Sequence, residues 1–131
     1  MVIQVSKTKT FIPKFNDNES LPQTEQVTVI LKNPTVAMRE KLIPPPQMVG
    51  RTGANGTTDG VEYQIFTPDK KRILMEMVQQ ITNCAYEENG AEKPISNTTE
   101  LLNAPSEFNG LVDELYQKCC AELQKTIPEK N

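Results

Sequence analysis

The chain has 131 residues, a formal net charge of −3, and neither His nor Trp. Its length fits a single domain. The absence of His excludes catalytic triads with an imidazole base and His-ligated zinc or haem sites. The acidic balance argues against nucleic-acid binding. We therefore expect a small, non-catalytic domain without a bound cofactor or metal ion.

The cysteines indicate a reducing compartment. The chain has an odd number of cysteines: Cys84, Cys119 and Cys120. Two of them are adjacent, and no CxxC motif occurs. This arrangement does not form a disulfide framework. The chain also lacks the apolar run of a signal peptide and the ~20 apolar residues of a membrane span. We expect a cytoplasmic protein that does not contact membranes.

Residues 1–26 are predicted to form an N-terminal arm followed by a polar loop. Residues 1–5 and 8–12 are β-prone, so the arm is either an edge strand or a mobile segment. Val27–Lys32 alternates apolar and polar side chains, which is typical of a half-buried strand. Asn33 and Pro34 then resemble a helix start, which predicts a short helix over residues 34–42.

A glycine-rich segment occupies the middle of the chain. Within residues 47–60, the stretch from 50 to 60 contains Gly50, Gly53, Gly56 and Gly60 and no apolar residue except Ala54. Residues 47–60 are expected to form a flexible loop at the tip of a hairpin whose second strand is Val61–Phe66. Neither GxGxxG nor a Gly-Lys-Ser/Thr motif is present, so phosphate binding is not indicated. The alternatives are a solvated loop or a segment that orders on a partner.

The second half of the chain is expected to be mainly helical. An apolar stripe at helical spacing predicts a helix from residue 67 to 84, and a second stripe predicts one from 105 to 126. A short helical turn is expected near residues 95–102. Gly110 lowers helix propensity, which suggests a close neighbour there. The predicted fold class is α+β, with a domain at residues 27–127. Its small antiparallel sheet would contain Val27–Lys32, Val61–Phe66 and the N-terminal arm, packed with three to four helices.

The helical stripes are either core or contact surface. Asp113 and Glu114 are expected on a solvated face, and a nucleophilic Cys119 would lack an imidazole base. The candidate binding surface combines the last helix with the glycine-rich loop. Its candidate residues are Leu111, Leu115, Leu123, Gly50, Arg51, Gly53, Asn55 and Gly56.

The order of these elements resembles a known family. A strand ending in Lys32-Asn33-Pro34-Thr35 precedes a charged helix around Met38–Leu42. An amphipathic helix, a cap at Ile95–Thr98 and a helix after Pro105 follow. This order is similar to that of the tail assembly chaperones of long-tailed phages and prophages.

The resemblance implies a non-enzymatic protein of the bacterial host cytoplasm. Members of that family bind the tape measure protein, whose hydrophobic helical stretches otherwise aggregate, and recruit tail tube subunits. They also tend to self-associate. Two other readings stay open. One is a structural phage tail or head–tail joining protein that forms rings, although a tube subunit would be richer in strands. The other is a small enzyme that uses Cys119.

Overall fold

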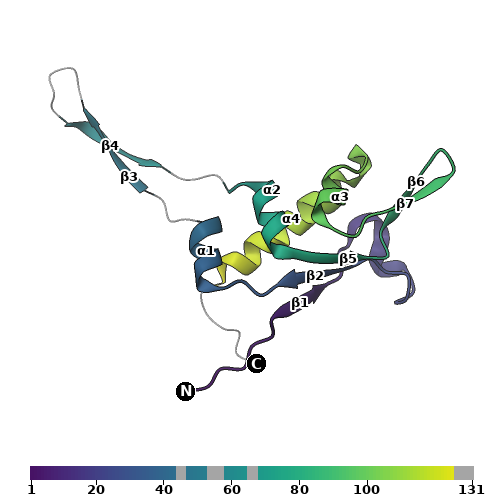
Figure 1. The fold of residues 1–131 in the computed structure, drawn as a ribbon. Helices are drawn as coiled ribbons and strands as arrows, with labels where there is room; N and C mark the ends of the chain where they lie inside the picture. Colours follow the sequence, from purple (N-terminus) through teal and green to yellow (C-terminus); the bar gives the residue numbers. More distant parts are fainter. Residues whose placement is uncertain (44–46, 53–57, 65–67, 126–131) are drawn as a thin grey trace.

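The computed structural model describes residues 1–43, 47–52, 58–64 and 68–125, and it has an α+β fold (Figure 1). A three-stranded antiparallel sheet has the order β1-β2-β5. Its strands are β1 (Thr8–Phe11), β2 (Thr28–Lys32) and β5 (Val78–Thr82). The predicted fold class is confirmed. The N-terminal segment therefore provides an edge strand, one of the two alternatives that the sequence left open.

Helices cover one face of this sheet. They are α1 (Val36–Leu42), α2 (Lys70–Met77), α3 (Thr98–Leu102) and α4 (Asn109–Gln124), with short 3-10 helices η1 (Phe15–Ser20) and η2 (Ser106–Phe108). Thr35, Asp69 and Asn97 each accept a backbone N–H at the start of a helix. The cap of the first helix is therefore Thr35, two residues after the Asn33 that the sequence suggested.

The helix predicted over residues 67–84 is wrong in its second half. Helix α2 ends at Met77, and the chain continues as strand β5. The register between β2 and β5 shifts between Ile30 and Leu31, so Gln79 is an extra residue in β5. Such a bulge places Val78 and Ile81 on the same face although they are three residues apart. That spacing imitates one turn of helix.

The predicted sheet also contains an error at Val61–Phe66. Strands β3 (Gln47–Thr52) and β4 (Thr58–Gln64) pair with each other and not with β2. Residues 47–52 and 58–60, which were expected to be loop, are thus part of a hairpin, and Ile65 and Phe66 lie outside the described residues. Figure 1 shows this hairpin projecting away from the sheet and helices.

A second hairpin follows β5, in a stretch where no strand was predicted. Strand β6 (Ala85–Glu88) pairs with β7 (Ala91–Pro94). Asn89 and Gly90 join them with φ angles of 53° and 80°. Two successive positive φ values are the signature of the type I′ turn, for which Asn-Gly is the preferred sequence. The segment after β7 then returns to the sheet, where the Ile81 N–H donates to the Ser96 carbonyl at 2.9 Å.

The hydrophobic core lies between the sheet and the helices. Strand β2 contributes Val29 and Leu31, and α2 contributes Ile73, Leu74 and Met77, all with no exposed surface. The opposite face of the sheet is polar, since Thr8 pairs with Lys32 and Thr28 with Thr82. This alternation is typical of an antiparallel sheet with one solvated face.

The polar loop between β1 and β2 is fixed by one buried amide. The Asn18 side chain donates to the carbonyls of Pro13 and Val27 at 2.8 and 3.0 Å, and its oxygen accepts the Val27 N–H at 2.7 Å. Asn16 and Asp17, just before it, have positive φ values. The hydrogen bonds of the Asn18 amide therefore stabilise the tight turn that the backbone makes at Asn16 and Asp17.

Helix α4 begins against an aromatic ring. A Cβ atom added at Gly110 would lie 3.0 Å from two ring carbons of Phe15. The ring centroids of Phe15 and Phe108 are 6.0 Å apart. The close neighbour suggested by Gly110 is therefore confirmed, and it is the first residue of η1.

Replacing Asn18 by Ala should lower the free energy of unfolding by about 2–3 kcal/mol, because two carbonyls and one N–H lose their partner in a buried site. Urea denaturation measures the change. The control is Asn16→Gly, at an exposed residue whose positive φ suits glycine, and it should change stability little. Equal effects of both substitutions would contradict the role of the Asn18 amide.

Gly110→Ala should destabilise the native chain by about 1 kcal/mol, although Ala is the better helix former, because its methyl group meets Phe15. In a Phe15→Leu background the same substitution should be stabilising. Comparing the two backgrounds by urea denaturation isolates the contact. The same sign in both would show that Phe15 is not the obstacle.

Candidate interaction surface

The leucine face predicted to bind a partner is part of the core. Leu111, Leu115 and Leu123 are at most 4% exposed and belong to the same buried cluster as Ile73 and Leu31. They lie on the face of α4 that packs against the rest of the fold. The binding prediction for these residues is therefore corrected: in the folded chain they are covered by the protein itself.

The candidate binding residues of the glycine-rich segment lie partly in strand β3 and partly outside the described residues. Gly50 and Arg51 are in strand β3, opposite Val61 and Gly60 of β4. Gly53, Asn55 and Gly56 lie outside the described residues. The structure therefore does not bring this segment together with the leucine face of α4 as one surface.

The thiols of Cys84 and Cys119 are poor nucleophiles. Cys119 is fully buried in the middle of α4. Burial, with smaller effects of Cys120 and Glu122, raises the pKa of the Cys119 thiol to about 12. Burial likewise raises the pKa of Cys84. Because the thiolate is the reactive form, both side chains stay protonated and unreactive near neutral pH.

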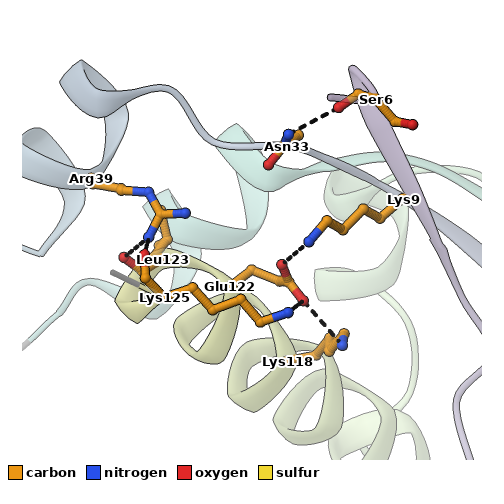
Figure 2. A network of polar contacts seen from close by, with 8 residues as sticks. All are labelled: Ser6, Lys9, Asn33, Arg39, Lys118, Glu122, Leu123 and Lys125. Carbon is orange, nitrogen blue, oxygen red and sulfur yellow. Dashed lines mark hydrogen bonds and ion pairs between the residues drawn. The ribbon is translucent and has the colours of Figure 1, made fainter. Parts of the chain in front are cut away.

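A buried carboxylate near the end of α4 contacts three lysine side chains (Figure 2). The Glu122 side chain is only 2% exposed, and it accepts a hydrogen bond from Lys9 of β1 at 2.8 Å. Lys118 and Lys125 lie 3.1 Å from its other oxygen, one turn before and after it. The carboxylate of Glu122 is thus surrounded by three lysine side chains, one from β1, one from α4 and one from the residue that follows α4.

The lysines keep this carboxylate ionised. Burial by itself would raise the pKa of Glu122, but the hydrogen bonds from Lys9, Lys118 and Lys125 outweigh it and lower that pKa to about 2. A group with so low a pKa does not exchange protons near neutral pH. Glu122 is therefore suited to hold the lysines in place rather than to act as a general acid or base.

Arg39 of α1 closes the same end of α4. Its guanidinium donates to the carbonyl of Leu123 at 2.9 Å and to that of Lys125 (Figure 2). The last carbonyls of a helix have no partner within the helix, and the helix dipole favours a cation there. Arg39 supplies both the donors and the charge, so α1 is attached to α4 by polar contacts.

The acidic pair at residues 113 and 114 is only partly solvated. Asp113 is exposed and pairs with Lys70 at 2.8 Å. Glu114 is half-buried and accepts the backbone N–H groups of Lys14 and Phe15 at 2.6 and 2.9 Å. The prediction of a solvated face is correct for Asp113 and wrong for Glu114, which fixes the start of η1.

The exposed apolar surface gathers on the N-terminal arm. Met1, Val2, Ile3 and Val5 are all more than half exposed. The arm leaves the fold at Ser6, whose carbonyl accepts the Asn33 side-chain amide at 2.9 Å, and the Lys7 carbonyl accepts the Asn33 N–H (Figure 2). These residues were predicted to be β-prone but were not among the candidate binding residues, although four of the five side chains at positions 1–5 are apolar.

None of the helices in the described part of the chain has both the length and the apolar character that a membrane span requires. Nor do His, Cys, Asp and Glu side chains gather there in groups of three that could hold a metal ion.

Glu122→Gln should lower the free energy of unfolding at pH 7 by about 2 kcal/mol, since the lysines lose their buried counter-charge. The native pKa lies below the ordinary value, so this stability is present above about pH 5 and lost as the pH falls toward about 2. The difference between native chain and variant, measured by urea denaturation, should therefore shrink over that range. Asp113→Asn, on the same helix but exposed, is the control and should have a much smaller effect.

Comparisons with known proteins add no relative: no protein-family model, no curated protein and no solved structure gives a significant match to this chain.

Proposed function

We propose that this protein is a non-enzymatic assembly chaperone that acts through contacts with other proteins. Its clients would be a phage tape measure protein and the tail tube subunits that assemble around it. The order of sequence elements around Lys32–Thr35 suggests the family. The chemistry of the described residues supports the non-enzymatic part, because Glu122 stays ionised and Cys119 stays protonated near neutral pH.

The observation that carries the proposal is the projecting hairpin β3–β4. Its strands pair only with each other, while the apolar stripes of α2 and α4 are used in the core. The hairpin stands away from the sheet and helices in Figure 1. A hairpin without support from the rest of a fold has few contacts of its own to hold it. Contact with a client would provide that support.

The second candidate is a ring-forming structural subunit of the phage tail or head–tail joint. The apolar arm at residues 1–5 favours it, because subunits of closed assemblies commonly exchange segments with copies of themselves. The two candidates differ in what the purified protein does alone. A ring-forming subunit assembles without a client, whereas a chaperone keeps a client in solution.

The test is co-expression with the long, helix-rich protein encoded beside it. The chaperone proposal expects that protein in the supernatant only when this chain is present, and expects the two to be recovered together. A variant in which a short Gly-Ser linker replaces residues 47–64 should fold but lose the client. The charge variant Val36→Lys, at an exposed residue of α1, is the control and should keep it.

Two results would overturn the proposal. The first is a neighbouring protein whose solubility does not depend on this chain. The second is a purified chain that forms rings or tubes by itself in electron microscopy, which would establish the structural-subunit candidate instead.

A further inference from the structure

The outer edge of β1 directs backbone groups away from the sheet. The Lys7 carbonyl faces β2, because it accepts the Asn33 N–H at 2.9 Å. Backbone groups of alternate residues point to opposite sides of an antiparallel strand, so those of Thr8 and Thr10 point away from β2. Both residues are exposed, and in the described part of the chain β1 pairs with β2 alone (Figure 1). This edge can therefore accept a further strand.

Lysines gather at this edge, although the chain as a whole has a net charge of −3. Lys7 is exposed at the start of β1 and forms no ion pair with a described residue. Lys9 of β1 and Lys118 of α4 share the carboxylate of Glu122 (Figure 2). These three ammonium groups thus face one carboxylate, and the edge has an excess of positive charge.

The positive charge selects which strands can pair with β1. Lysines on an edge strand disfavour its pairing with another basic strand, a second copy of β1 included, because like charges placed opposite each other are destabilising. A strand with Asp or Glu opposite Lys9 would be attracted by the same charges. Specific interfaces commonly combine a repulsive and an attractive element in this way.

Phe11 defines a second position in a strand added to β1. Its side chain is half-buried and lies on the same face of β1 as that of Lys9. The Lys118 Nζ lies 5.6 Å from the centre of its ring. A side chain opposite Phe11 would therefore contact apolar surface, whereas a side chain opposite Lys9 would meet the positive charges. In an antiparallel strand, the apolar residue comes two positions before the acidic one.

We propose that the β1 edge binds an extended acidic segment of another protein, which joins the three-stranded sheet as a fourth strand. The segment has an apolar residue opposite Phe11, any residue opposite Thr10, and Asp or Glu opposite Lys9. Backbone hydrogen bonds to Thr8 and Thr10 supply affinity, and the two side-chain positions supply specificity, as is usual for strand addition. The β3–β4 hairpin takes no part, so this inference does not rest on the proposed function.

A designed peptide tests this proposal on the full chain. The probe is Ser-Thr-Ile-Thr-Glu-Thr-Ser-Trp, and its fluorescence anisotropy can be followed selectively because the chain has no Trp. The probe is expected to bind saturably, and more weakly as salt is added. Replacing its Glu by Lys should weaken binding at least about tenfold, because attraction at the position opposite Lys9 becomes repulsion.

Substitutions at Thr10 test whether the peptide joins the sheet. Thr10→Pro removes the N–H that the added strand needs but no hydrogen bond to β2, and proline is tolerated on an edge strand in such a position. It should abolish peptide binding and change urea denaturation little. Thr10→Val keeps both the N–H and the branched side chain, so this matched control should bind like the native chain.

A modified peptide makes the same test on the unaltered chain. Methylating the backbone nitrogen of the Thr between Ile and Glu removes the N–H that donates to the Thr10 carbonyl. This peptide should not bind, whether or not Thr10→Pro affects folding.

Four results would overturn the proposal. They are no saturable binding of the probe, equal binding of the Glu and Lys peptides, binding that survives methylation, and an affinity that falls as the concentration of the chain rises. The last result would show that a second copy occupies the edge. No client protein enters these experiments, so their failure would leave the co-expression test of the proposed function unaffected.

Discussion

The burial of one carboxylate constrains the arrangement of the whole domain. Glu122 lies on the core side of α4, and a charge in such a place is tolerated only when it is paired and hydrogen-bonded. Lys9 can reach it only if β1 lies along α4, so the edge strand is fixed by charge as well as by the ladder to β2. Arg39 attaches α1 to the same helix end. The core is apolar in its middle and ionic at this end.

The sequence predicted the parts of the fold whose periodicity is undisturbed. Strand β2 and helix α4 lie where alternation and helical spacing placed them, and Gly110 correctly indicated a close neighbour. The second half of the helix predicted over residues 67–84 failed because the bulge at Gln79 gives Val78 and Ile81 a helical spacing within a strand. The β6–β7 hairpin was not predicted, although Asn-Gly, here Asn89-Gly90, is the strongest short hairpin signal.

The candidate surface was harder to predict than the fold. A stripe such as Leu111 and Leu115 shows that a helix face is covered, but it does not tell whether the cover is the same chain or another one. Glu122 was the only polar interruption of that stripe, and its lysines at neighbouring turns were the clue to an ionic cluster. The arm was predicted as an edge strand or a mobile segment, but residues 1–5 are too few to indicate that their apolar side chains are exposed.

The two edges of the central sheet differ: the edge at β1 is open, whereas the edge at β5 is covered by another segment of the chain. Because the chain segment at Ile95 and Ser96 occupies the outer edge of β5, a strand added at β1 finds no second open edge across the sheet. A strand that paired with β1 would therefore leave no further edge of this sheet open for another addition. Sheets open at both sides can instead propagate into fibrils. Because the short return of the chain after β7 covers one edge of the central sheet, the addition of a strand to that sheet would be restricted to β1.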